Sequence, residues 1–167
     1  MPDEDMGSQE YLWRMCAQNF DQARHHEGQR ATVATAHIAV SGALIGLITF
    51  DQNISPWDLP LAIFLIITSV FGLFFQAKQY ERFDLHMERA RTYRDALDAT
   101  LPGTPIKILK LAADERNAKK HPFLEPLRLN RFWALFYVLI ALLGVGLSVA
   151  AIGAPFVAWL EPRVSLH

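Results

Sequence analysis

The stretch that decides the fold runs from residue 59 to residue 75 and reads LPLAIFLIITSVFGLFF. It contains no charged side chain. As a helix rising 1.5 Å per residue it would span about 25 Å, close to the thickness of a bilayer core. Trp57 stands just before it, where an interfacial aromatic side chain is common. These features predict a transmembrane helix.

Two further stretches have the same character. Residues 31–50 carry no formal charge and would span about 30 Å as a helix, and residues 132–160 are longer than one crossing needs. Trp133 and Trp159 mark the two ends of the last stretch, and Pro155 is expected to kink it or to lie just outside the membrane. Three such runs are costly to bury in a small soluble domain. The sequence therefore predicts an all-α membrane protein with three transmembrane helices.

Lysine and arginine are distributed unequally between the connecting segments. Residues 1–30 hold three, residues 76–131 hold twelve, residues 51–58 hold none and residues 161–167 hold one. The positive-inside rule places the N-terminus and residues 76–131 in the cytoplasm and the C-terminus on the periplasmic or extracellular side. The acidic start has no apolar run behind it, so we expect no signal peptide and insertion through the internal helices.

The helices are expected to extend beyond the membrane. Nothing between Arg30 and Ala31 would stop a helix, which predicts one helix over residues 8–50. The second helix is predicted over 59–100, ending at Leu101-Pro102-Gly103. A short cytoplasmic helix is predicted over 105–120 and the third transmembrane helix over 132–160. We expect a long helical hairpin that extends into the cytoplasm, within a single membrane domain covering residues 1–167.

The cytoplasmic part of the second helix carries a heptad-like apolar seam. The cytoplasmic half of the first helix is its natural partner, and the seam could alternatively be the surface that binds a cytosolic protein. Its members recur at intervals of 3, 4, 3 and 7 residues and are Tyr80, Phe83, Met87, Ala90 and Leu97.

Composition excludes several functions. The net charge of -1 argues against nucleic acid as a partner. The single cysteine, Cys16, excludes an intramolecular disulfide and a zinc site built of thiolates. We find no catalytic motif, so we expect no enzyme, no catalytic residue, no cofactor and no metal site. His25 and His26 point about 100° apart on a helix and are interpreted as part of a solvated helix face.

A polar stripe on the first transmembrane helix contains Arg30, His37 and Ser41. Ionisable side chains in membrane segments usually face protein or water rather than lipid. Such a stripe could line a lumen or gate. The alternative, which the sequence favours, is that neutral His37 donates a hydrogen bond to a neighbouring helix and stabilises packing.

Small residues at intervals of four predict close helix packing, either within one subunit or between subunits. They are Gly42 and Gly46 on the first transmembrane helix, and Gly146, Ala150 and Ala154 on the third. With three membrane helices, burial of the polar faces favours a homo-oligomer in the lipid bilayer. Arginines within residues 82–94 are expected to be solvated or paired, with an anionic headgroup or anionic ligand as an alternative partner.

The layout of residues 8–100 resembles the SLATT-type and RipA-type small oligomeric bacterial membrane proteins. The residues that carry this resemblance are Tyr11–Arg30 leading into 31–50, then 59–75, then Tyr80-Glu81-Arg82-Phe83 and Tyr93-Arg94. The third transmembrane helix departs from the two-helix pattern of the SLATT type. The resemblance implies a homo-oligomer in the bacterial inner membrane that forms or controls a pore, under a partner that senses infection or stress.

Two functions follow as hypotheses. The first is a homo-oligomeric pore-forming or membrane-perturbing effector in a defence or stress system. The second is a non-conducting scaffold or anchor that recruits a cytosolic partner through its helical stalk. A membrane enzyme or a transporter is disfavoured, because the sequence shows no set of convergent catalytic groups and the chain is small.

Overall fold

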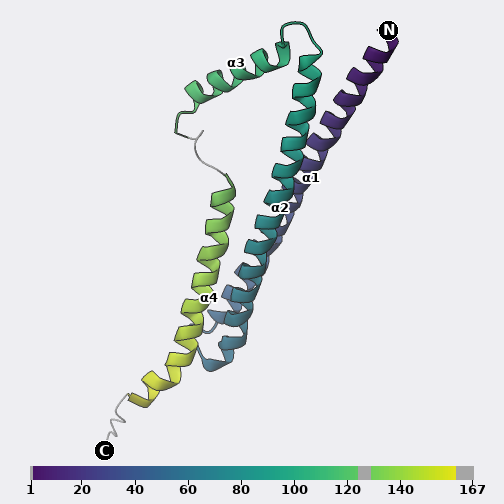
Figure 1. Cartoon of the computed structure of the whole chain (residues 1–167). Helices are drawn as coiled ribbons and strands as arrows, with labels where there is room; N and C mark the ends of the chain where they lie inside the picture. The colour runs from purple at the N-terminus through teal and green to yellow at the C-terminus, as the bar shows by residue number, and fades with distance from the viewer. Residues whose placement is uncertain (1, 124–128, 161–167) are drawn as a thin grey trace, which may run out of the picture. The chain divides into compact units, whose positions relative to one another are not determined.

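The computed structural model describes residues 2–123 and 129–160, and Figure 1 shows its helices. They are α1 (Pro2–Ile48), α2 (Leu59–Ala99), α3 (Pro105–Lys120) and α4 (Leu129–Leu160), with a short 3-10 turn, η1 (Pro56–Asp58), before α2. The described residues form helices and turns and no strand. The all-α prediction is confirmed, and the helix boundaries lie within three residues of those predicted except at the start of α1. That helix begins at Pro2 rather than near residue 8, because proline fits the first turn of a helix.

Three helices are long and apolar enough to cross a membrane. Within the described residues they lie in Gly7–Ile48, Pro56–Ala99 and Asn130–Gly153. The length and the apolar composition of these helices indicate a membrane-embedded protein. Many of their large apolar side chains point outward, among them Phe71 at 66% and Phe74 at 71% exposure, as contact with lipid requires.

The chain divides into two compact units. Unit 1 comprises Met1–Arg30 with Lys78–Asn130, and unit 2 comprises Ala31–Ala77 with Arg131–His167. The divisions fall where polar sequence changes to apolar sequence, so unit 2 contains the three apolar segments.

Unit 2 is held together by apolar side chains from α1, α2 and α4. Its buried core consists of Leu44, Ile48, Ala62, Leu65 and Leu147. Two glycines allow the helices to approach closely. A Cβ on Gly72 would overlap the ring of Tyr137, and a Cβ on Gly144 would lie 2.8 Å from Cγ1 of Ile66. The fit of α4 against α2 therefore depends on these two glycines.

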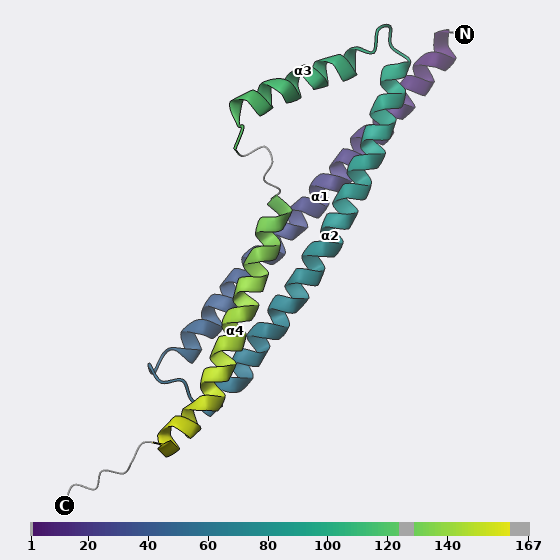
Figure 2. The ribbon, with the colours of Figure 1, turned by 60° about the vertical axis from the view of Figure 1, so that its left-hand side comes forward.

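Unit 1 is a pair of helical segments followed by α3. The parts of α1 and α2 in this unit bury Cys16, Ala23 and Ala90 between them, and Cys16 Sγ donates a hydrogen bond to the Ala90 carbonyl oxygen at 3.4 Å. In both views α3 leaves the end of α2 after a short turn (Figure 2). Gly103 and Thr104 adopt left-handed φ angles of 75° and 48° in that turn, a conformation that glycine adopts more easily than threonine.

Candidate functional site

The polar residues of the apolar segments form a buried cluster in unit 2. His37 Nε2 lies 3.3 Å from Ser41 Oγ and 3.4 Å from Ser69 Oγ of α2. The imidazole ring also packs 4.8 Å from the Tyr137 ring of α4, centroid to centroid. Ser69 also donates its hydroxyl to the Leu65 carbonyl oxygen at 2.8 Å.

The cluster is enclosed by the chain's own helices. His37 is 7% exposed, Ser41 2% and Ser69 1%. This is the arrangement that the packing interpretation of His37 predicts, with α1 tied to α2 by side-chain hydrogen bonds. A lumen or gate lined by His37 and Ser41 stays a prediction.

Arg30 belongs to unit 1 and has partners of its own. The guanidinium is 3% exposed. It donates to Glu27 Oε2 at 2.8 Å and to Asn130 Oδ1 at 3.0 Å, and its Cζ lies 5.5 Å from the centroid of the Tyr80 ring. Arg30 therefore ties α1 to α2 and to the first residues of α4 by charge-assisted and cation–π contacts.

The small residues singled out in the sequence face open space in the single chain. A Cβ built on Gly42, Gly46 or Gly146 would meet no described atom within 4 Å, and Ala150 is exposed. The side chain of Ala154 lies outside the described residues. Their role in packing between subunits stays a prediction. The glycines that pack within the chain are Gly72 and Gly144, which we did not single out because a glycine's contact partner is not visible in its own helix.

The predicted seam of α2 faces α1. Ala90 is fully buried beneath Cys16, while Tyr80, Phe83, Met87 and Leu97 are half-buried. Burial raises the pKa of the Cys16 thiol above its usual value, so the thiolate is disfavoured.

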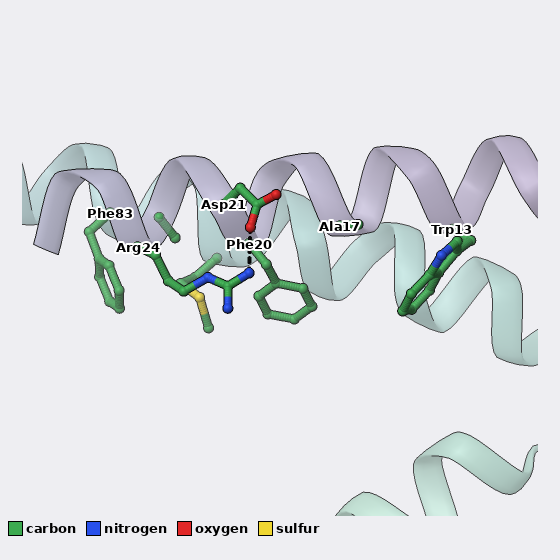
Figure 3. A pocket seen from close by; sticks show the side chains of 8 residues that line it. Trp13, Ala17, Phe20, Asp21, Arg24 and Phe83 are labelled. Atoms are coloured by element: carbon green, nitrogen blue, oxygen red, sulfur yellow. Dashed lines mark hydrogen bonds and ion pairs between the residues drawn. The ribbon is translucent and has the colours of Figure 1, made fainter. Parts of the chain in front are cut away.

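Phe83 and Met87 line a groove of about 370 Å³ with residues of α1. Figure 3 shows Trp13, Phe20 and Phe83 around this groove, beside the ion pair of Arg24 with Asp21. Trp13 is 60% exposed.

A stacked histidine pair in unit 1 was not predicted. The rings of His26 and His86 lie 5.4 Å apart with an 18° interplanar angle. Each Nδ1 contacts an amide side chain, His26 with Gln79 Oε1 at 2.6 Å and His86 with Asn19 Oδ1 at 3.1 Å. Burial, reinforced by His26, Arg89 and Arg82, lowers the pKa of His86 below its ordinary value.

This lowered pKa predicts a pH dependence of unfolding. The folded state favours neutral His86, so its contribution to stability is complete above about pH 6.5 and is lost as pH falls through the lower pKa of the folded state. We expect the unfolding temperature in detergent to fall more steeply between pH 7.5 and pH 5.5 in the natural protein than in His86→Gln. A parallel fall in both proteins would contradict this assignment.

Asp98 organises the start of α3. Its Oδ1 accepts from the Ile106 backbone N–H at 2.8 Å and its Oδ2 from that of Lys107 at 3.0 Å, and its side chain is 3% exposed. A carboxylate at this position satisfies two of the unpaired donors of a helix N-terminus. The capping residue comes from the end of α2, seven residues before the start of α3, so helix-capping rules for adjacent residues could not identify it.

Most residues of α3 are exposed. Every residue of this helix is described and none is buried. Ile108, Leu109 and Leu111 are 59%, 67% and 57% exposed. The predicted short helix therefore exists, with exposed apolar side chains among basic ones.

Metal chemistry gains no support from the geometry. Among the residues that the structure describes, no group of three or more His, Cys, Asp or Glu side chains could hold a metal ion.

Comparison with protein-family models, with curated proteins and with solved structures gave no significant match. The resemblance to SLATT-type and RipA-type proteins stays a prediction, and the functional argument rests on the residues of this chain.

Proposed function

We propose that the protein is a membrane-anchored, non-conducting scaffold that recruits an acidic cytosolic partner through α3. The observation that supports this proposal is a helix that is held at its start and mostly exposed along its length. Asp98 fixes the first turn of α3, and none of its described side chains is buried. A fixed helix with exposed apolar side chains is available to bind another molecule.

The charge of α3 indicates the chemistry of the partner. The helix holds five lysine or arginine residues against two acidic ones. Residues 7–30 and 78–99 each hold equal numbers of Asp/Glu and Lys/Arg side chains, and so do residues 121–130. Within residues 7–30 and 78–130 the excess positive charge therefore lies in α3. Ile108 and Leu111 are three residues apart and share one side of the helix. A partner that offers apolar and acidic side chains together complements this surface.

The location of the partner follows from topology. The lysine and arginine distribution favours a cytoplasmic position for α3, so the partner is a cytosolic protein. The resemblance of residues 8–100 to bacterial defence-associated membrane proteins adds the proposal that this partner senses infection or stress.

Photo-crosslinking in living cells tests the proposal. We would place benzoylphenylalanine at Ile108 and, as the matched control, at Asn117, which lies on the opposite side of α3. We expect one dominant adduct from position 108 and little from position 117. The double substitution Lys107→Glu and Lys110→Glu should abolish the adduct, because it reverses the charge beside Ile108.

Asp98→Ala provides a second variant. Loss of both backbone hydrogen bonds should destabilise the start of α3 by about 1–3 kcal/mol and reduce the adduct. Equal adducts from both positions, or an adduct that survives charge reversal, would contradict the scaffold proposal.

The second candidate is the pore-forming or membrane-perturbing effector. The observation that favours it is the histidine and serine cluster within the apolar segments, because ionisable groups in membranes are often functional. Ion efflux from liposomes that contain the protein, altered in His37→Leu, would support the effector and exclude a non-conducting scaffold. The enclosure of His37 by the chain's own helices is the reason that we place this candidate second.

A further inference from the structure

A pair of histidine rings joins α1 to α2 in the middle of unit 1. The rings of His26 and His86 are stacked, with their centroids 5.4 Å apart and an interplanar angle of 18°. Both side chains are half-buried. Each ring also contacts an amide side chain of the other helix, His26 that of Gln79 and His86 that of Asn19. The rings and the amides therefore form one polar layer between the two helices.

The amide partners determine which nitrogen of each ring can take up a proton. An amide oxygen only accepts hydrogen bonds, so Nδ1 of each ring carries a hydrogen and donates it, His26 to Gln79 Oε1 and His86 to Asn19 Oδ1. The amide of Asn19 is oriented independently, because its Nδ2 donates to the Met15 carbonyl oxygen at 2.9 Å. In a neutral ring Nε2 is then unprotonated. An added proton binds there, makes the ring a cation and leaves the Nδ1 hydrogen bond in place.

The charged groups near the pair come from both helices. They are His25, Glu27 and Arg30 on α1 and Arg82 and Arg89 on α2. The carboxylate of Glu27 accepts a hydrogen bond from Arg30. Arg82 and Arg89 lie about one turn to either side of His86, and both lower its pKa, as burial and His26 do. A proton added to the pair therefore meets mainly positive charge.

Little apolar burial holds the helices together around the pair. Between Cys16 and Arg30, the buried side chains of α1 are those of Asn19 and Ala23. Residues 79–89 of α2 are all described, and none of them is buried. Charge repulsion within the polar layer is therefore opposed by a small apolar contact.

We propose that His26 and His86 form a proton-operated switch of unit 1. With neutral rings, stacking and the amide hydrogen bonds hold α1 against α2. With both rings protonated, two like charges lie 5.4 Å apart, and the helices separate in this stretch. Acidification opens the switch, because the open form binds protons more readily than the closed form. The change is confined to unit 1, unlike unfolding of the whole chain, and it does not depend on whether α3 binds a partner.

Spin-label distances in the full-length protein in nanodiscs test the switch. Gln22→Cys on α1 and Leu85→Cys on α2, in a Cys16→Ala background, place labels at exposed positions of the two helices. Pulsed electron paramagnetic resonance should give one short distance at pH 7.5 and an additional, longer distance at pH 5.5. The ratio of long to short distances should rise by about tenfold or more, since one extra proton bound by the open form changes it by up to about a hundredfold over two pH units.

Substitutions of the pair identify the groups that titrate. His26→Gln and His86→Gln keep a side chain that can form hydrogen bonds but carries no charge, so each should show the short distance at both pH values. His25→Gln is the matched control, because His25 is exposed on the same helix, and it should keep the response to pH. His86→Lys is charged at both pH values and should show the longer distance at both.

A label pair within unit 2 separates local opening from unfolding. Val40→Cys and Val70→Cys, both at exposed positions, should keep one distance between pH 7.5 and pH 5.5. Four results would overturn the proposal. They are an unchanged distance in unit 1 on acidification, a response that persists in both glutamine variants of the pair, a short distance in His86→Lys, and a distance in unit 2 that lengthens together with that in unit 1.

Discussion

Gly72→Ala is expected to destabilise the protein by about 1–3 kcal/mol through overpacking. The added Cβ would overlap Cε1 of the Tyr137 ring and lie 2.6 Å from its Cδ1. Tyr137 is 1% exposed and packs against His37, so its ring has little room to move. The helix propensity of alanine favours the variant by about 1 kcal/mol, but that gain offsets only part of the overlap.

Thermal unfolding in detergent would measure this effect. A thiol-reactive fluorophore can report unfolding, because the single cysteine is buried in the folded chain. Gly153→Ala is the matched control, since a Cβ there meets no described atom within 4 Å, and it should unfold at the natural temperature or slightly above it. Gly72→Ala should lower the unfolding temperature less in a chain that also carries Tyr137→Leu than in the natural chain. If both glycine variants unfold at the same temperature, Tyr137 does not crowd position 72 as described.

Arg30→Ala is expected to destabilise unit 1 by about 3 kcal/mol, because it removes a buried guanidinium together with all of its contacts. The change deletes the hydrogen bonds to Glu27 and Asn130 and the contact with the Tyr80 ring together. The carboxylate of Glu27 retains 40% side-chain exposure, so water can solvate it and the cost stays below that of a fully buried charge.

Two comparisons isolate the contribution of the Arg30 contacts. Arg14→Ala removes a pair with Glu10 whose side chains are 75% and 61% exposed, and it should change stability by less than about 1 kcal/mol. Arg30→Lys keeps the positive charge but lacks the planar guanidinium with its several N–H donors. It should therefore be less destabilising than Arg30→Ala and less stable than the natural protein. The measurement is the same thermal unfolding curve, and an Arg30→Ala effect no larger than that of Arg14→Ala would contradict the role described here.

The helices were predictable because their signals are local. Uncharged apolar runs, proline and glycine at 102–103 and proline at 105 are sufficient to place α1, α2, α3 and α4. The period of the polar stripe also predicted that His37 and Ser41 share a side of α1. In the structure His37 Nε2 lies 3.3 Å from Ser41 Oγ.

The unpredicted contacts join residues that are distant in sequence. His86 meets Asn19 across 67 positions, and Arg30 meets Asn130 across 100. Glycine illustrates the limit most clearly. Gly42 and Gly72 each lie in an apolar run, yet a Cβ would be crowded at Gly72 and unobstructed at Gly42 within the single chain. Which glycine packs depends on the partner helix, and no property of the glycine's own segment contains that information.

The enclosure of His37 has a consequence for biogenesis. The first apolar segment is synthesised before the residues that cover it, because Ser69 follows His37 by 32 positions and Tyr137 comes later still. A histidine and a serine side chain facing lipid alone are unfavourable, and α2 supplies the first hydroxyl that can satisfy the ring from another helix. The order of synthesis therefore favours insertion of α1 and α2 as a pair. In this pair Ser69 of α2 contacts His37 before Tyr137 of α4 completes the enclosure.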